Sequence, residues 1–391
     1  MNGPDLLLPA PVQAAALPEV RNHTPYPSQY FQMMDTGDEV FHVIVSRITY
    51  DLTRLDEQGA PPLAAVQAPL VEADEFYGDP TSSSCIQESD FAPYKPKCDI
   101  LLAHAVAYAP EGKPHQRWPV GIRIGEWQKM LAVTGARYVD RGLLGWKVTE
   151  PQKATQVPLR WELAYGGTCQ WPRHLKEDEE PEIFKAFEAN PLGTGWTDKA
   201  WLKKAQVADV DAPQIEVFDQ PFGTEDANAM AYPAVGVGPV GKWWTPRRQK
   251  AGTYDQAWKE SRWPRLPQDF DFGYWNAAPE DQQIDYPQGG EELLLAGLTP
   301  GQQVWRCKLP EPAIHAVLRM QIGPIVRLPM RLDTLVLDFK AGTLSCVYRI
   351  HVAAQFGPRV LEIRSGRAPI SAAPLPTSRW RSGGGCTRPR C

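Results

Sequence analysis

The stretch TLVLDFKAGTLSCVYRIHV, from Thr334 to Val352, contains two runs of alternating apolar and polar side chains, separated by Lys340-Ala341-Gly342. An alternation with a period of two places every second side chain on the same face of a β strand. The glycine provides a turn between the runs. The sequence therefore predicts a β hairpin here, with these residues on one buried face: Leu335, Leu337, Phe339, Leu344, Cys346, Tyr348 and Ile350.

Other segments repeat this alternation. They are VFHVIVSRITYDL (Val40–Leu52), the run CDILLAHAVAYAP that begins at Cys98, and Val120–Val139, where Gly125-Glu126 divides two alternating halves and predicts a second hairpin. We therefore expect a mainly β fold, in which antiparallel sheets form a sandwich or a barrel-like arrangement with long loops and a few short helices. Each strand is expected to bury one face.

Helical patterns are few and short. Residues Glu180–Asn190 have apolar side chains at helical spacing and are followed by a proline, and Thr197 is a candidate N-cap for a second short helix. Each helix would have about two or three turns. The rest of the region 177–283 has the pattern of loops, and a long loop inside a compact domain indicates either a function or an unrecognised element.

These patterns divide the chain into three parts. Residues 1–20 are rich in alanine and proline, and we expect a flexible extension. Residues 366–391 contain five Arg and no acidic residue, and we expect a disordered basic tail. The part between them, residues 21–365, is expected to form either one domain or two β subdomains joined by the loop-rich region 177–283.

The composition argues against several classes of protein. The 391 residues have a formal net charge of −5, whereas nucleic-acid binding relies on clustered Lys and Arg. No run of 18 apolar residues occurs, so we expect no membrane-spanning helix and a cytoplasmic location. Seven Cys and seven His are scattered without paired spacing, so neither a disulfide framework nor a zinc site is predicted, and no cofactor is expected.

The segment Pro246–Gln282 combines three Trp, two Tyr and two Phe with six basic and six acidic residues. Trp, Tyr and Arg dominate the energetics of protein interfaces, because each buries a large area and keeps a polar group. The balanced charges suit internal ion pairs that hold a long loop in one shape. We therefore predict that this region binds another polypeptide through Trp243, Trp244, Arg247, Arg248, Tyr254, Asp255, Trp258, Arg262, Trp263 and Trp275.

Two patterns suggest chemistry instead. Gly236–Lys242 (GVGPVGK) fits two phosphate-loop patterns, but Trp243 and Pro246 follow where a helix should begin, so we interpret it as a turn that passes close to its neighbours. Asp269 and Asp271 would share one face of a strand and could act as the carboxylate pair of a glycosidase. A carbohydrate-active enzyme or lectin with a Trp-rich cleft is therefore the alternative function.

Several separated blocks of the sequence resemble one bacterial family, long labelled a domain of unknown function and encoded beside the VgrG and PAAR-type spike genes of type VI secretion systems. The main block is WTPRRQKAGTYDQAWKESRWPRLPQDFDFGYWNAAPEDQ, from Trp244 to Gln282. The others are, in chain order, NHTPYP (Asn22–Pro27), Ala73–Leu102, AYGG (Ala164–Gly167) and NPLGTGW (Asn190–Trp196). Together the blocks extend over about residues 22–363.

The resemblance implies a non-enzymatic adaptor or chaperone. Members of that family are regarded as proteins that help to load a toxic effector, often one with a PAAR-like domain, onto the VgrG spike in the bacterial cytoplasm. No catalytic residue and no cofactor is attributed to them. The sequence departs from the family pattern before Arg21 and after Ser365.

Overall fold

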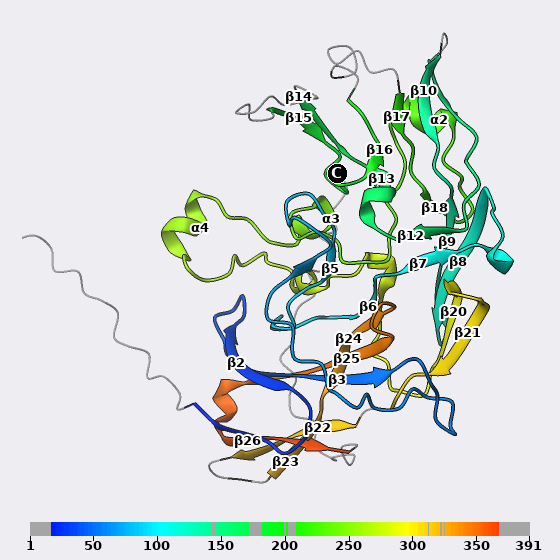
Figure 1. The fold of residues 1–391 in the computed structure, drawn as a ribbon. Coiled ribbons are helices and arrows are strands. Elements are labelled where there is room, and N and C mark those ends of the chain that lie inside the picture. The colour runs from blue at the N-terminus through cyan, green and yellow to red at the C-terminus, as the bar shows by residue number, and fades with distance from the viewer. Residues whose placement is uncertain are drawn as a thin grey trace, which may run out of the picture.

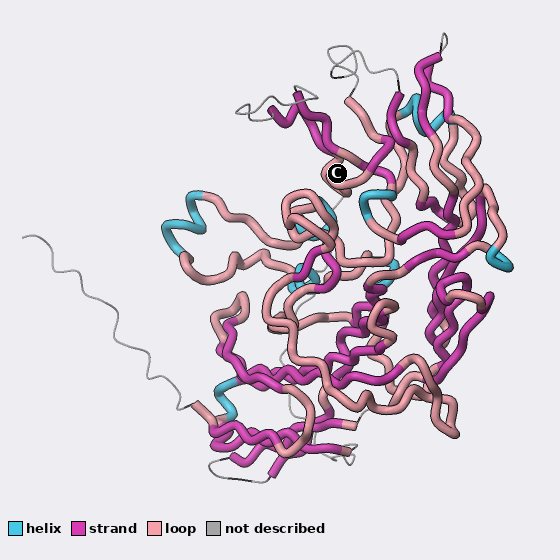
Figure 2. Tube along the Cα trace, in the orientation of Figure 1, coloured by secondary structure: helices cyan, strands magenta, loops and turns pink. Residues whose placement is uncertain are grey.

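The computed structural model describes residues 17–366, except 143–144, 172–181, 199–200, 202–208, 312, 321–322 and 324. Strands dominate this part of the chain, and they are joined by long loops (Figures 1 and 2). The described residues hold only three short α-helices: α2 (Thr224–Ala229), α3 (Thr245–Arg248) and α4 (Gln256–Ser261). The prediction of a mainly β fold with antiparallel sheets, long loops and few helices is confirmed, but none of the described sheets closes into a barrel.

The largest sheet contains the predicted hairpin at its centre. Leu337 pairs with Leu344 and Asp338 with Thr343 across the turn, where Gly342 has a φ of 65° that favours glycine. Four of the five pairings in this sheet are antiparallel, and the pairing of β6 with β24 is parallel. In spatial order the strands are β19 (Gln283–Ile284), β6 (Cys98–Ala103), β24 (Arg331–Asp338), β25 (Thr343–Ala353), β3 (Val40–Asp51) and β2 (Ser28–Met34).

Two further sheets pack against it. The predicted turn at Gly125-Glu126 joins β8 and β9 and is confirmed, with Ile124 paired to Trp127. The five-stranded sheet has the order β18 (Ile215–Val217), β9 (Trp127–Thr134), β8 (Arg117–Ile124), β20 (Glu292–Thr299) and β21 (Gln302–Lys308). The four-stranded sheet has the order β1 (Glu19–Asn22), β26 (Pro358–Ser365), β22 (Ile314–Met320) and β23 (Ile325–Pro329).

The remaining elements are small. A three-stranded sheet contains β11 (Gly145–Val148), β10 (Tyr138–Gly142) and β17 (Asp209–Asp211). The two-stranded pairs are β12 (Gln156–Pro158) with β7 (Val106–Tyr108), β13 (Tyr165–Gly166) with β16 (Thr194–Gly195), β14 (Thr168–Trp171) with β15 (Glu182–Ala186), and β4 (Glu75–Phe76) with β5 (Cys85–Gln87). The 3-10 helices are η1 (Pro110–Gly112), η2 (Trp161–Leu163), η3 (Phe272–Trp275), η4 (Glu280–Gln282) and η5 (Ala354–Phe356).

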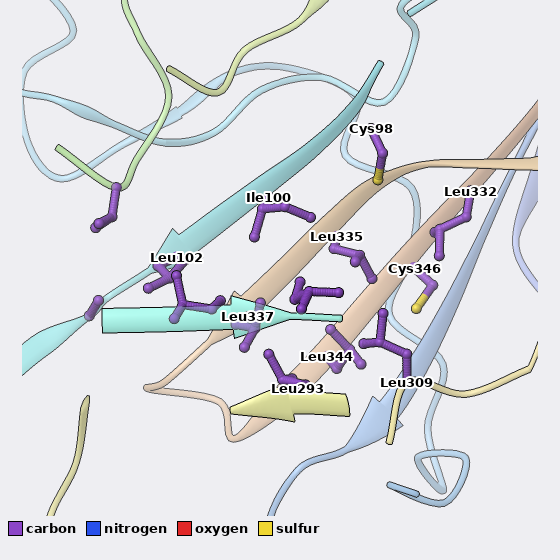
Figure 3. Packing of buried hydrophobic residues seen from close by; sticks show 14 of the residues in the cluster. Cys98, Ile100, Leu102, Leu293, Leu309, Leu332, Leu335, Leu337, Leu344 and Cys346 are labelled. Carbon is purple, nitrogen blue, oxygen red and sulfur yellow. The ribbon is translucent and has the colours of Figure 1, made fainter. Parts of the chain in front are cut away.

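A single apolar core lies between the three larger sheets. Side chains of the central hairpin meet side chains of β6, β20 and the segment after β21 (Figure 3). Burial of such side chains is the main favourable term in folding, at about 25 cal/mol per Å². The residues labelled in the figure are Cys98, Ile100, Leu102, Leu293, Leu309, Leu332, Leu335, Leu337, Leu344 and Cys346.

Strands from before and after the loop-rich region 177–283 occupy the same sheets. β3 pairs with β25 along its whole length, β6 pairs with β24, and β8 pairs with β20. Each of these pairings joins strands that are separated by at least 160 residues, as the strand bounds show. The two flanking parts of the chain therefore build joint sheets around one core.

The expectation that each strand buries one face is wrong for the centre of the largest sheet. β6 and the interior of β3 are buried on both faces, and so is most of β25. One face carries the apolar core. Loops cover the opposite face, where a smaller apolar cluster that includes Leu101, Ala103 and Val336 lies beside a set of charged and polar side chains. We call this second set of side chains the buried polar layer; its members on the strands include Arg47, Asp99, Asp333, Thr334 and Arg349.

Ion pairs neutralise the buried polar layer. Arg349 donates from Nε to Asp333 Oδ2 (2.6 Å), and both side chains are 3% exposed. The same guanidinium also donates to the carbonyl oxygens of Asp90 and Ala92. Arg47 pairs with Asp90 (Nη1 to Oδ2, 3.0 Å). Because an isolated charge is costly to bury, these contacts fix the loop around Asp90 on the sheet.

Asp99 connects the layer to the far end of the loop-rich region. Its carboxylate accepts from Lys95 Nζ (2.8 Å), from Asn276 Nδ2 (2.9 Å) and from the backbone N–H of Ala277 (2.9 Å) and Ala278 (3.2 Å). A carboxylate with this many donors is well compensated for its loss of water. The segment after η3 is therefore held against the edge of the sheet.

The helix predicted over Glu180–Asn190 is absent from the described part of that range, where β15 forms an antiparallel pair with β14 instead. An isolated helix of this length is marginal in water, so tertiary contacts decide the local structure. Phe187 packs near Tyr165 (5.3 Å between ring centroids) and Trp196 (6.1 Å). The proposed second helix after Thr197 lies largely outside the described residues, as do most of residues 1–20 and nearly all of the basic tail.

The buried polar layer generates a stability prediction. We expect Asp333→Ala to lower the free energy of unfolding by roughly 3 to 5 kcal/mol, because it leaves the buried Arg349 without its carboxylate. Asp285→Ala removes a carboxylate that is 93% exposed and pairs with Lys97, and we expect a loss of less than about 1 kcal/mol. Urea denaturation of both variants checks this difference, and equal losses would contradict it.

Candidate functional site

The segment between α3 and η3 leaves the body of the protein and returns to it. Figures 1 and 2 show α4 at the far end of this excursion, away from the sheets. We call residues 252–266 the arm. The segment lies within the region that the sequence singled out, and its two ends are held by different contacts.

The first end is fixed by two residues that the sequence predicted as partner contacts. Trp244 is buried and its ring meets that of Trp161 edge to face, at 5.2 Å between centroids. Arg247 is buried as well; it forms a two-pronged ion pair with Glu88 and donates to the carbonyl oxygens of Val240 and Tyr274. Both side chains therefore hold the fold together and are not available at the surface.

The glycine-rich stretch Gly236–Lys242 is a turn that passes close to its neighbours, as predicted. A Cβ atom at Gly236 would lie 2.9 Å from the Trp161 ring, and one at Gly241 would lie 2.5 Å from Trp244 Nε1. The Trp161 indole N–H donates to the Gly238 carbonyl oxygen (3.3 Å). These glycines allow the backbone to lie against two tryptophan rings.

The two chain segments at the start and end of the arm, here called its neck, are joined by Asp269. Its carboxylate accepts from Thr253 at the backbone N–H (3.0 Å) and at Oγ1 (2.7 Å), and these bonds lower the pKa of the carboxyl below its usual 3.8. The backbone N–H of Asp271 donates to the Lys250 carbonyl oxygen (2.9 Å). Gly252 has a φ of 79°, and a Cβ atom there would come within 2.9 Å of Pro267. The two chain segments of the neck are thus fixed side by side.

The predicted strand that would align Asp269 with Asp271 does not form. Asp271 instead caps η3 and accepts from the Gly273 N–H (2.8 Å). Phe270 and Phe272 are buried and the two carboxylates are exposed, so the alternation itself is real. Both carboxylates shape the turns that carry the arm, and this capping role was not foreseen from the sequence.

The tip of the arm is built around α4. The Asp255 side chain accepts from the Trp258 N–H (2.8 Å) and caps the helix. Tyr254 and Trp258 stack edge to face at 4.7 Å, and the Trp258 indole N–H donates to the Arg265 carbonyl oxygen (2.9 Å). The tip is therefore ordered by its own side chains.

The part of the arm that follows α4 is tied to the turn between β2 and β3. Arg262 donates to Asp38 Oδ1 (2.9 Å) and to the Thr36 carbonyl oxygen (3.1 Å), and Arg265 donates to Asp38 Oδ2 (2.9 Å). Asp38 comes from a part of the sequence more than 200 residues away, so nothing in the local pattern identified it. One carboxylate thus pairs with two of the arm's arginines.

The predicted contact residues fall into three groups. Trp244 and Arg247 are buried, as described above. Arg248 pairs with Glu188 at the surface (2.6 Å), Asp255 caps α4, and Trp258, Arg262 and Trp275 are partly buried. The remaining three expose large aromatic surfaces to solvent: Trp243 (80% exposed), Trp263 (64%) and Tyr254 (54%).

A small pocket of about 290 Å³ lies at the root of the segment. Its walls are mostly apolar and include Trp161 and Val240, while Lys129 and Lys250 supply charge. Lys129 donates from Nζ to the Gly236 carbonyl oxygen (2.8 Å) and to Asp281 Oδ1 (2.8 Å), and its burial lowers the pKa of its amine. Each charge here has a partner, which favours a structural role.

Other chemistry has little support within the described residues. No group of three or more His, Cys, Asp or Glu side chains there could hold a metal ion. No described helix has the length and apolar character needed to cross a membrane. The five described cysteines are buried and free, and burial raises the pKa of the Cys307 thiol to about 12; Cys386 and Cys391 lie outside the described residues.

The fold and the site define a β-sheet protein with a projecting aromatic arm. Over residues 36–349 the chain matches a family described as uncharacterized protein conserved in bacteria (DUF2169), and it belongs to that family. No curated protein matches the chain, and neither does any solved structure. The matched range includes the arm, the central hairpin up to Arg349 and the anchoring Asp38.

The neck of the arm generates a prediction about local stability. We expect Asp269→Ala to speed tryptic cleavage after Lys259, Arg262 and Arg265 by about fivefold or more, because losing roughly 1 kcal/mol of hydrogen bonding raises the open population. Since the carboxyl pKa is depressed in the folded state, this stabilisation is present above the usual carboxyl pKa and is lost as pH falls through the lowered value.

Timed digestion at neutral pH checks this effect. Glu260→Ala is the matched control, because its carboxylate accepts from Gln256 within α4 and does not bridge the neck. The free energy of unfolding of both variants should stay within about 1 kcal/mol of the parent. Equal cleavage of Asp269→Ala and the parent would show that the neck does not depend on this carboxylate.

Proposed function

We propose that this protein is a non-enzymatic adaptor or chaperone that binds a type VI secretion effector and helps to load it onto the VgrG spike. Its partners would be the effector, here called the client, and the VgrG and PAAR-type spike components, in the bacterial cytoplasm. The blocks of sequence that resemble the type VI family support this proposal, and so does membership of a family conserved in bacteria. The main structural support for the proposal is the projecting arm.

The chemistry of the arm suits recognition of a polypeptide. Tyr254 and Trp263 expose large rings on a segment that projects from the body. Exposed aromatic surface is unfavourable in water, and contiguous patches of it commonly mark interaction sites. Burying such a ring in a partner's pocket is among the strongest single contributions to binding between proteins.

The arm is also ordered before any partner arrives. Asp269 closes its neck, Asp255 caps its helix, and Asp38 holds the part after α4 through Arg262 and Arg265. Preorganisation lowers the conformational entropy that binding would otherwise cost. Because Asp38 already pairs with both of these arginines, aromatic contact and not an ion pair with the client would supply most of the affinity.

The proposal predicts that the arm's exposed rings dominate binding of the client. With the polypeptide encoded beside this chain's gene as the probe, we expect Trp263→Ala to weaken the complex about tenfold or more, since truncation of such a ring costs roughly 2 kcal/mol. Tyr254→Ala should have a smaller effect in the same direction. Isothermal titration calorimetry on the purified proteins gives both values.

Phe218→Ala is the matched control, because Phe218 is also an exposed aromatic residue (45%) and follows β18, outside the arm. The free energy of unfolding of all three variants is measured in parallel, so that loss of binding is separated from loss of fold. Failure of the parent protein to form any complex with this probe or with the spike would refute the proposed function. Equal binding by Trp263→Ala and Phe218→Ala would refute the role of the arm.

A further inference from the structure

β2 is the outermost strand of the largest sheet, and the pattern of its hydrogen bonds can be derived. Arg47 N donates to Pro27 O, and Asp35 N donates to Glu39 O, so the pairs with β3 that share hydrogen bonds fall at odd positions of β2. Even positions therefore direct their N–H and C=O groups away from the sheet. These outward groups belong to Ser28, Tyr30, Gln32 and Met34.

The outward groups of β2 have no backbone partner among the described residues. Gln29 Nε2 makes one long contact with the Tyr30 carbonyl oxygen (3.4 Å). The pairing with β3 runs over seven residues without a bulge, so the free edge is regular. It is therefore a template on which a further strand can form hydrogen bonds.

The sequence of β2 lacks the usual protection of an edge strand. Ser28–Met34 (SQYFQMM) contains no charge, no proline and no glycine. Charged side chains and proline at edges normally discourage pairing with other chains. The edge strands of the four-stranded and five-stranded sheets have them: Glu19 and Arg21 in β1, Arg327 and Pro329 in β23, Glu216 in β18, and Arg306 and Lys308 in β21.

The free edge of β2 adjoins the part of the arm that follows α4. The turn that follows β2 contains Thr36 and Asp38, which bind Arg262 and Arg265 of the arm. Trp263, with 64% of its surface exposed, lies between these two arginines in the sequence. In Figure 1, β2 forms the rim of the sheet below the arm. A partner that contacts the arm would thus reach β2 without crossing the body.

We propose that an extended segment of the client adds to β2 as a seventh strand of the largest sheet. This inference rests on the proposed function and specifies how the client is held. One face of β2 carries Phe31 beside Phe91, and the other carries Tyr30 beside His42, so neither face offers a charged partner to an added strand. The client segment would therefore be uncharged over about four to seven residues, with apolar side chains at alternate positions.

Hydrogen exchange tests the proposal directly. In the free full-length chain we expect the outward amides of Tyr30 and Gln32 to exchange much faster than the amides of Phe31 and Met33, which face β3. In the complex with the polypeptide encoded by the adjacent gene, exchange at Tyr30 and Gln32 should slow by about tenfold or more. Mass spectrometry with residue-level fragmentation measures all four amides.

A pair of variants gives a second test. Gln32→Pro removes one outward N–H, and the sheet tolerates proline there because this N–H faces away from β3. Gln32→Ala keeps the N–H and is the matched control. We expect the client's affinity to fall about tenfold or more in Gln32→Pro and to change little in Gln32→Ala, with both variants equally folded by thermal unfolding.

The outcomes separate this inference from the proposed function. If the client binds and Trp263→Ala weakens it, but Tyr30 and Gln32 gain no protection and Gln32→Pro binds as Gln32→Ala does, the adaptor role stands and the added strand is refuted. Protection of these amides in the free chain would also refute it, because a second copy or another part of this chain would then occupy the edge. If no complex forms, both proposals fail.

Discussion

The buried polar layer on the largest sheet is the constraint on which the rest of the structure depends. Arg47, Asp99, Asp333 and Arg349 are buried, and each charge must be matched because a lone buried charge costs several kcal/mol. Arg349 and Asp333 pair with each other, but other partners come from loops that are distant in the sequence, such as Asp90 for Arg47 and Asn276 for Asp99. Matching the charges therefore decides where those loops lie, in a way that apolar packing alone would not.

The position of the arm follows from this layer. Asp99 holds the segment after η3, and Arg247, through Glu88, holds the segment before the arm. Both ends of the segment are thus attached to the body by contacts of definite geometry. The hydrogen bonds between Asp269 and Thr253 then hold the two ends of the arm close together. A long polar and aromatic segment that would otherwise be a mobile loop becomes an arm with a defined direction.

The sequence predicted those features that depend on local pattern. The hairpin through Gly342 and the turn at Gly125-Glu126 were found because alternation and glycine act over a few residues. Features that depend on distant partners were missed: the alternate charges of β3 and β25 resembled a solvent-facing side, and Asp38 carries no local sign of binding the arm. At the site, three of the ten residues predicted to bind a partner expose their rings, whereas the burial of Trp244 and Arg247 cannot be derived from composition.

The pairing of β3 with β25 has a consequence for synthesis on the ribosome. β3 ends at Asp51 and β25 begins at Thr343, about 290 residues later. At translation rates of about 5 to 20 residues per second, β25 is synthesised roughly 15 to 60 s after β3, and β3 lacks this pairing partner until then. During that interval its apolar side chains are open to misassociation, so the nascent chain has a long window in which binding by the cell's folding machinery would protect it.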